Sequence, residues 1–533
     1  MSFISLNFIY VFLPVVLICF YGINRYYPRI QVFYLLGVSF FYCAYVDFDA
    51  ALLLASSIGF NYVIASLIRS LKRKRTRRTL LWLGVLLNVA TLFWYKFTLE
   101  TSFRNVDASL EQANVFLDVG IPLGISFYTF YQISFLIDTY KSDVHFLSFQ
   151  RYSLSASMFS QLPAGPILNY NDGLNQFGHL GEGRVQRHYL FKGLSLFSFG
   201  LVKKVLLADH LGMATNQVHY AISDGQTLNA LESFVASWGF LLQLYFDFSA
   251  YSDMAIGLGL CFGLTFPINF NSPFKAKTFT DFISRWHMSL IGFTRTYIFL
   301  PVTKVVKKIA KGKAVRRQFI SWMVGLQVSF LVINIWHAPT LMLVLQGLFL
   351  GFFFVMVKLA SMAFEKISRW RTAKIKWIRS FKAGLNQVLV LTTISVFAVL
   401  LRTRSFNEVI TVFSGFKKLP GLKAEAGGFP TQTLDVLTSY SFFPSIEDPI
   451  KLMGADFLPI PLLPFLILLS LITLMLPNTM QIFGLVRMPE GKWYSDIRWQ
   501  PNLAWGIITG FTLALYAMVA NENLIKEFLY GGF

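Results

Sequence analysis

The sequence predicts an all-α polytopic integral membrane protein. Of its 533 residues, 55% are hydrophobic and only 14% are charged, whereas soluble domains carry about 25% charged residues. The mean hydropathy is +0.54. The apolar residues form runs that approach the length of a bilayer-crossing helix, about 20 residues. Since such runs recur along the whole chain, we expect one membrane domain over residues 1–533 and no separate soluble module.

The apolar segments follow one another in order along the chain. Some are short enough to be tilted or re-entrant, so we expect about 11–13 transmembrane or re-entrant helices. The first segment is too long for a cleaved signal peptide and has no small-residue cleavage site, so it is expected in the mature protein. The segments are residues 6–23, 32–46, 50–68, 80–97, 121–137, 189–207, 231–248, 251–266, 279–300, 319–335, 340–359, 388–401, 458–476 and 503–519.

Three basic runs predict the orientation of these helices. Residues 72–78, 304–317 and 366–382 hold six, seven and seven Lys or Arg residues, with no acidic residue inside any run. Together they equal the net charge of +20. Each run joins two apolar segments, which is typical of cytoplasmic loops under the positive-inside rule. A binding site for an anionic carrier or coenzyme is the alternative. We expect contact with the lipid bilayer and no nucleic-acid partner.

Counting segments outward from the basic runs places both the N-terminus and the long polar insertion outside the cytoplasm. The insertion, residues 403–456, contains Gly and Pro clusters and is expected to form an extracytoplasmic loop. A short amphipathic helix is expected near residues 406–416.

Cysteine and histidine spacing gives no support for a metal site. Cys19, Cys43 and Cys261 lie inside apolar segments, and none of the seven histidines forms an HxxxH pattern. We therefore expect no metal and no permanently bound cofactor.

Two polar features interrupt the apolar pattern. Residues 161–167, QLPAGPI, contain two prolines and a glycine, so the backbone must leave the helix there, which is tolerated at membrane depth only when protein or a water-filled cavity shields it. Asp247 and Asp253 lie in an otherwise apolar run. We expect these carboxylates to cap broken helices or to pair with Arg285 or Arg295; direct acid–base chemistry is the alternative.

Two histidines, each directly after a tryptophan, are the best candidates for chemistry. They are His287, after Trp286, and His337, after Trp336. Ionisable residues at bilayer depth are costly and are usually kept for a site or pathway. A neutral imidazole can take and return a proton near pH 7, which suits a general base. The alternative is a histidine that is hydrogen-bonded to a neighbouring helix or packed against its tryptophan.

Longer motifs resemble a known family. Residues 245–301 contain FDFSAYSDMAIGLGLCFGLTFPINFNSPF and FISRWHMSLIGFTRTYIFLP, and further motifs are IPLGISF at 121–127, GLVKKV at 200–205 and the Trp336-His337 pair. Together they resemble the membrane-bound O-acyltransferase (MBOAT) family. Within it, the match is to the bacterial branch of alginate O-acetylation and teichoic acid D-alanyl transfer membrane proteins. The likeness is best over residues 115–350.

The resemblance implies an MBOAT fold, in which helices surround a central tunnel, and an acyltransferase in the bacterial cytoplasmic (inner) membrane. His337 would be the catalytic histidine and His287 the second one. An acyl group, acetyl by default, would pass from a cytoplasmic thioester, acetyl-CoA or a phosphopantetheine carrier, to a hydroxyl of an extracytoplasmic polysaccharide or partner protein. The expected protein partners are an extracytoplasmic acyltransferase or esterase-like protein and a cytoplasmic acyl-carrier protein. The candidate substrate or tunnel residues are Arg285, Trp286, Trp336, Asp247, Asp253, Asn269 and Asn271.

The sequence departs from the family pattern after the second tryptophan-histidine pair. Ala338 and Pro339 follow His337, where the branch usually has glycine, Gln346 lies near the place of a usual tryptophan, and Thr296 replaces a common aspartate after arginine. Three other functions therefore stay open: D-alanyl transfer to teichoic-type polymers, transport of an envelope precursor, and a non-catalytic part in exopolysaccharide export. The sequence has no internal repeat, which counts against a transporter.

Overall fold

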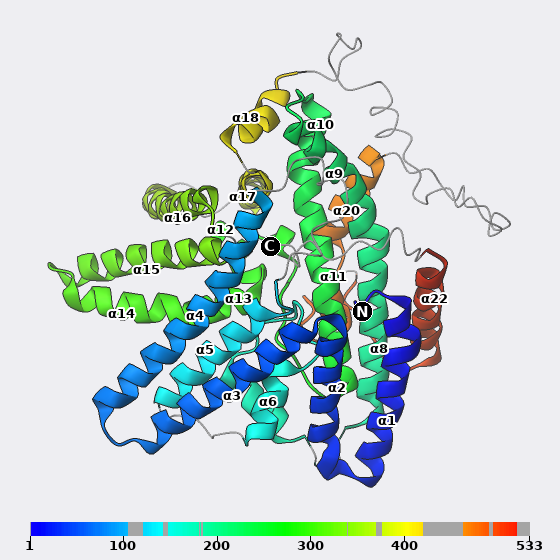
Figure 1. The fold of residues 1–533 in the computed structure, drawn as a ribbon. Coiled ribbons are helices and arrows are strands. Elements are labelled where there is room, and N and C mark those ends of the chain that lie inside the picture. Colours follow the sequence, from blue (N-terminus) through cyan, green and yellow to red (C-terminus); the bar gives the residue numbers. More distant parts are fainter. Residues whose placement is uncertain are drawn as a thin grey trace.

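The described part of the chain is helical throughout. The computed structural model describes residues 2–104, 121–141, 148–180, 182, 185–337, 339–368, 376–403, 405–418, 462–489 and 494–519. Within those ranges there is no β-strand, and the helices gather around a central vertical pair, α8 and α11 (Figure 1). The predicted all-α polytopic membrane fold is confirmed.

Helices follow one another with short connections. In the first half they are η1 (Phe8–Phe12), α1 (Leu13–Tyr26), η2 (Pro28–Ile30), α2 (Gln31–Val46), α3 (Phe48–Ser70), α4 (Lys74–Arg104), α5 (Ile125–Lys141), α6 (Phe149–Ser157), α7 (Tyr170–Gly178), α8 (Arg187–Val202), η5 (Lys203–Asp209), α9 (His210–Ser223), α10 (Ala230–Phe234), η6 (Val235–Gly239) and α11 (Phe240–Cys261). In the second half they are η7 (Pro273–Lys275), α12 (Phe279–Arg285), α13 (Met288–Thr294), η8 (Arg295–Phe299), α14 (Leu300–Ile309), α15 (Ala314–His337), α16 (Leu341–Ser368), α17 (Lys376–Arg402), α18 (Phe406–Gly415), α20 (Leu462–Met475), α21 (Thr479–Ile482) and α22 (Leu503–Val519).

Seven helices in the described ranges are long and apolar enough to cross a membrane. They are Phe8–Tyr26, Pro28–Val46, Phe48–Ser70, Lys74–Phe97, Ala314–His337, Leu341–Ala360 and Ala383–Arg402. Two shorter apolar helices are Leu462–Met475 and Leu503–Met518. In the structure, other predicted segments correspond to short or interrupted helices.

Helix α11 forms the centre of the protein, because every residue from Phe240 to Cys261 is buried. Helix α8 packs along it at glycine contacts. A Cβ atom on Gly193 would lie 2.5 Å from the Gly257 carbonyl oxygen, and one on Gly257 would lie 2.6 Å from the Gly193 carbonyl oxygen. Small residues at such a crossing let two backbones approach closely, which drives helix association in lipid. On another side of α8, the Ser195 hydroxyl bonds to Thr509 of α22 at 2.8 Å.

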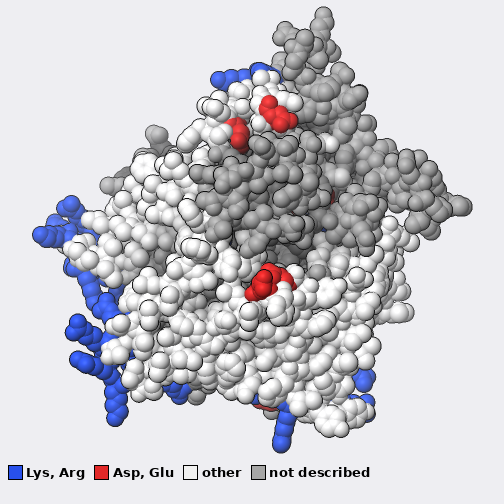
Figure 2. Space-filling model, viewed as in Figure 1, with Lys and Arg blue, Asp and Glu red and all other residues white. Residues whose placement is uncertain are grey.

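The peripheral helices expose apolar side chains, as a lipid-facing surface requires. Leu86, Trp94, Phe352 and Phe511 are 61%, 72%, 60% and 66% exposed. Lys and Arg side chains gather at the left of the space-filling view, where the α3–α4 and α14–α15 turns lie (Figure 2). The basic residues therefore mark one end of these hairpins.

Three predicted segments required correction. Residues 231–248 and 251–266 do not form two broken helices, because α10, η6 and α11 run on without a gap from Ala230 to Cys261. The predicted segment 279–300 is interrupted: α12 ends at Arg285 and α13 begins at Met288. The carboxylates of α11 are paired, as described below, so that helix has no need to break at them.

Two local predictions are confirmed. Residues 161–167 lie in a non-helical stretch between α6 and α7. The expected amphipathic helix is α18, whose Ser405 cap accepts a bond from the backbone N–H of Glu408 at 3.3 Å. Most of the predicted 403–456 loop, from residue 419 on, lies outside the described residues, as does Ala338. The central tunnel stays a prediction.

The α8–α11 contact gives a stability prediction. In Gly257→Ala the new Cβ would meet the Gly193 carbonyl oxygen at 2.6 Å and the Phe197 nitrogen at 2.7 Å. Overpacking against backbone typically costs about 1–3 kcal/mol, more than the roughly 0.5–1 kcal/mol that alanine gains over glycine in a helix. We expect a lower melting temperature in detergent. The control is Gly59→Ala in α3, where no atom lies within 4 Å; equal melting of both variants would contradict this packing.

Candidate active site

His287 lies at the break between α12 and α13. Its backbone has φ of 44°, in the left-handed region, which costs a non-glycine residue about 1–2 kcal/mol. This conformation turns the chain between the two short helices and keeps His287 only 3% exposed. The Phe248 ring of α11 packs against the imidazole in a T-shaped arrangement, with the ring centres 4.7 Å apart. The break therefore places a buried imidazole against the central helix.

Asn269 holds His287 through both backbone and side chain. The Met288 backbone N–H donates to the Asn269 carbonyl at 2.9 Å. The Asn269 side-chain oxygen lies 3.3 Å from His287 Nδ1 and accepts from the Ser289 hydroxyl at 2.6 Å. Its amide group donates to Ser252 of α11 at 3.0 Å. Because the Asn269 oxygen can only accept, we assign the His287 proton to Nδ1 and the lone pair to Nε2.

His337 is the last residue of α15, and Lys96 of α4 holds that end of the helix. The Lys96 ammonium donates to the backbone carbonyls of Trp336 and, at 3.0 Å, of His337. It also lies 5.1 Å from the centre of the Trp336 ring. The last carbonyls of a helix have no partner within the helix and carry partial negative charge. A buried ammonium therefore fixes the backbone that carries His337.

The structure brings the two histidines together from separate elements. They lie close enough for a charge on one ring to act on the other, and Lys96 acts in the same way on His337. Phe130 of α5 packs between the two elements, with ring centres 5.1 Å from Trp336 and 4.6 Å from Phe293 of α13. His287 is buried and His337 is half-buried.

The two carboxylates of α11 pair with lysines, so the expected pairing with Arg285 or Arg295 was wrong. Asp247 lies 2.6 Å from Lys204, which also contacts Asp209 at 2.7 Å. Asp253 lies 2.6 Å from Lys203 and accepts from the Thr479 hydroxyl at 2.7 Å. Both carboxylates are only 2% exposed and lie within a continuous helix rather than at broken ends. Burial of a charge in lipid requires such a partner.

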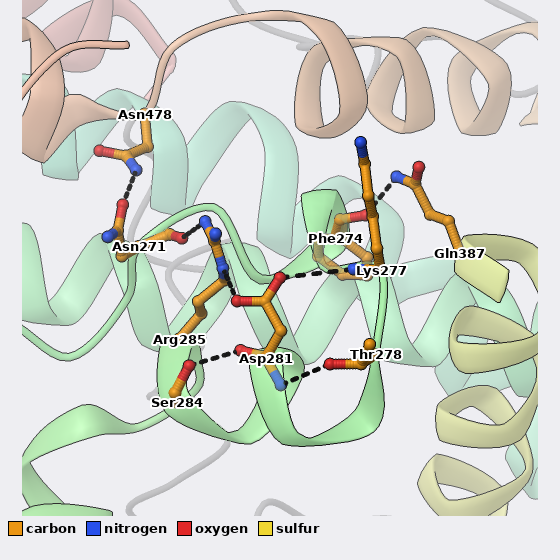
Figure 3. Close-up of polar contacts among 9 residues, drawn as sticks. All are labelled: Asn271, Phe274, Lys277, Thr278, Asp281, Ser284, Arg285, Gln387 and Asn478. Carbon is orange, nitrogen blue, oxygen red and sulfur yellow. Dashed lines mark hydrogen bonds and ion pairs between the residues drawn. The ribbon is translucent and has the colours of Figure 1, made fainter. Parts of the chain in front are cut away.

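Three other predicted candidates precede His287 in the sequence: Asn271, Arg285 and Trp286. The Arg285 side chain reaches Asp281 of its own helix at 2.6 Å and the Asn271 carbonyl at 3.3 Å (Figure 3). It is one-third exposed. Trp286 stacks on Phe282 with ring centres 5.5 Å apart. The side chains of Arg285 and Trp286 thus have structural contacts of their own.

Asn269 also lines a polar pocket. Its other walls include Ser252, Asp253, Lys203 and Thr479. The predicted candidates Asn269 and Asp253 therefore meet at one pocket, and the bonds of Asn269 connect that pocket with His287.

Comparison with known proteins identifies the family. A model of the MBOAT, membrane-bound O-acyltransferase family, matches residues 136–396. The peptidoglycan O-acetyltransferase of Helicobacter pylori is 30% identical over 448 residues, which are 78% of this chain and 79% of that protein. The chain belongs to the membrane-bound O-acyltransferase family.

Two other relatives are more distant or cover less. The probable alginate O-acetylase AlgI of Pseudomonas aeruginosa is 32% identical over 66% of this chain and 65% of its own length. The teichoic acid D-alanyltransferase of Bacillus subtilis is 25% identical over 51% of this chain and 65% of its own length. The predicted family and the prediction of an acyltransferase are confirmed.

Sequence reasoning missed several residues of this candidate site. Lys96 was placed within an apolar segment, and its charge there was the signal that could have marked it. Lys203 and Lys204 were noted only as part of a motif. Ser289 and Ser252 gave no signal, since serine is common in membrane helices and their roles arise from contacts with Asn269.

The lysine pairs give a second stability prediction. Lys204→Met removes the ammonium that contacts both Asp209 and Asp247, and breaking a buried pair in this way costs about 3–5 kcal/mol. Asp247→Asn leaves the contact of Lys204 with Asp209, so we expect a smaller loss. Melting of the purified acyltransferase in detergent measures both, with the exposed Lys72→Met as control. Equal losses of stability in Lys204→Met and Asp247→Asn would contradict the sharing of the Lys204 ammonium by Asp209 and Asp247.

Proposed function

We propose that this acyltransferase moves an acetyl group from a cytoplasmic thioester to a hydroxyl of an extracytoplasmic polysaccharide, directly or through a partner protein. The observation that carries the proposal is that Phe130 packs against both Trp336, which precedes His337 at the end of α15, and Phe293 of α13, the helix that follows His287. A pair of imidazoles, one buried and bonded to Asn269 and the other half-buried on backbone fixed by Lys96, suits proton transfer at a reacting hydroxyl.

The position of the pair along the helices supports a site near the outer face. Helix α15 carries basic residues at its start, and His337 lies about 30 Å further along, at 1.5 Å per residue. Helix α4 begins at the basic Lys74, and Lys96 lies a similar distance, about 33 Å, from it. If the basic ends face the cytoplasm, as the positive-inside rule indicates, both residues lie across the hydrocarbon core from it. The N-terminus is then extracytoplasmic.

The proposed reaction needs one base. His337 takes the proton of the acceptor hydroxyl, and the oxygen attacks the thioester carbonyl. The bond between the carbonyl carbon and sulfur breaks, an ester forms, and the proton passes from the imidazolium to the thiolate. A group with a near-neutral pKa can serve both transfers, which is the reason for a histidine here.

His287 has a separate role in the proposal. With its proton on Nδ1, held toward Asn269, the Nε2 lone pair accepts a hydrogen bond from the acceptor hydroxyl or from protonated His337. His287 thus orients the reacting groups and does not act as the general base. The structural bond to Asn269 and a role in the site are compatible, because they use different nitrogens.

The donor and the partners follow from the reaction class. The thioester is acetyl-CoA or an acyl-phosphopantetheine carrier protein, entering from the cytoplasmic side of the bacterial inner membrane. An extracytoplasmic acyltransferase or esterase-like protein would pass the group on to the polymer. Acetyl is favoured over D-alanyl because the relatives named for O-acetylation are more similar, at 30% and 32% identity, than the D-alanyltransferase at 25%.

The main test is the replacement of His337. In proteoliposomes with radiolabelled acetyl-CoA or acyl-carrier thioester, His337→Ala should lose about 10²–10⁴-fold in transfer while it melts like the parent chain. The control is His188→Ala, whose side chain is exposed. Near-normal turnover of His337→Ala would contradict the assignment.

The same assay separates the rival functions. Each assay is run with the chain alone and with candidate extracytoplasmic partner proteins. Label that appears on the partner or polymer supports acyl transfer. Movement of an unacylated envelope precursor into the vesicles, without transfer of label, would instead indicate a transporter. A complex that transfers label equally well with the His337→Ala chain would indicate a non-catalytic component.

Lys96 gives a further prediction as a positioning residue. Lys96→Met removes the bonds to the last carbonyls of α15, so His337 should be displaced, and a misplaced base costs up to about 10²-fold in rate. We expect kcat to fall while the KM for the donor stays the same, and Lys96→Arg to restore part of kcat. A loss of thermal stability with unchanged kcat would instead show that Lys96 only stabilises the fold.

A further inference from the structure

Arg402, the last residue of α17, lies outside the histidine site, and its hydrogen-bond partners are unusual for a half-buried arginine. Its guanidinium donates to the side-chain oxygen of Asn216 in α9 at 2.5 Å and to that of Gln243 in α11 at 3.3 Å. The Phe240 ring lies below it, with the guanidinium carbon 4.6 Å from the ring centre. Two elements, α9 and α11, therefore fix the position of this cation.

Both hydrogen-bond acceptors are neutral amides. Within the described ranges, no Asp or Glu lies within ion-pair distance of Arg402, whereas Lys203 and Lys204 each contact a carboxylate. A cation removed from water is stable only when a counter-charge or several dipoles compensate it. Two amide oxygens occupy only two of the five N–H groups of a guanidinium. The remaining N–H groups of the guanidinium and its positive charge favour the binding of an anion.

A pocket lies next to this cation. Arg402 lines it together with Thr215, His219 and Thr403, while Val399 and Val412 provide apolar walls. Thr215 donates to the same Gln243 oxygen at 2.5 Å. Gly212 allows this arrangement, since a Cβ atom there would lie 2.7 Å from the Gln243 amide nitrogen. Both threonine hydroxyls already donate to the protein, Thr215 to Gln243 and Thr403 to the Val399 carbonyl at 3.0 Å. The charged donor that an oxyanion would meet in this pocket is therefore the Arg402 guanidinium.

We propose that this pocket binds a carboxylate or phosphate group. Helix α17 begins in the basic run 366–382 and Arg402 is at its other end, so the site faces the acceptor side in the orientation proposed above. The anion would come from a uronate-type acceptor polymer or from the headgroup of an anionic lipid. Arg402 would then hold the charged part of the acceptor while a hydroxyl reaches His337; this role rests on the proposed function, whereas anion binding itself does not.

The binding test uses the full chain in nanodiscs of phosphatidylcholine. Addition of a short oligouronate should raise the melting temperature, and its carboxyl-reduced neutral counterpart should not. Arg402→Gln should weaken oligouronate binding about tenfold or more, because charged hydrogen bonds are lost, and Arg402→Lys should keep part of the binding even if the glutamine variant folds poorly. The matched control is Arg29→Gln, whose side chain is exposed.

A second arm replaces part of the phosphatidylcholine by phosphatidylglycerol, without oligouronate. Stabilisation that depends on Arg402 in this arm alone assigns the pocket to a lipid headgroup, and stabilisation in the first arm alone assigns it to the acceptor. Absence of stabilisation in both arms, or stabilisation that Arg402→Gln leaves unchanged, would overturn the proposal. His337→Ala should lose acyl transfer and retain anion binding. If instead the parent chain binds the anion but transfers no acyl group, the proposed function is disproved and this site is not.

Discussion

The pairing of two lysines with two carboxylates inside the membrane is the constraint on which the centre of the protein depends. Helix α11 is buried along its whole length and carries Asp247 and Asp253. Without Lys204 and Lys203 beside them, the desolvation of these charges would oppose burial of the helix. Both lysines belong to η5, so the same pairs fix η5, which continues α8, against α11. They therefore also fix the surface to which Asn269 and His287 are bonded.

The candidate site arises where elements end or break rather than within regular helices. His287 occupies a left-handed position between two short helices, and His337 is the final residue of α15. The left-handed backbone at His287 is strained. The end of α15 at His337 leaves helix carbonyls without partners inside the helix. Asn269 and Lys96 supply the missing bonds. The Asn269 amide and the Lys96 ammonium thus hold the chain at the two histidines, and the imidazole rings are left for chemistry.

The sequence allowed prediction of what depends on local pattern. The helical membrane class, the break at 161–167, the helix at 406–416 and the two histidines followed from hydropathy, proline content and isolated ionisable residues. Pairing between distant residues was not predictable from one sequence. Asp253 and Lys203 are 50 positions apart, so Asp253 was expected at a broken helix, although its partner makes a continuous helix stable. Arg402 was missed because it lies at a segment end, where arginine is ordinary.

The bond between Lys96 and the end of α15 has a consequence for biosynthesis. Its two partners are 240 positions apart, which at about 5–20 residues per second corresponds to some tens of seconds of translation. During that time α4 is already made, but the carbonyls of Trp336 and His337 do not exist. The Lys96 ammonium must then stay with interfacial water, which its long side chain can reach. The lysine can leave the water only after α15 arrives, so completion of the site coincides with closure of this side of the nascent protein.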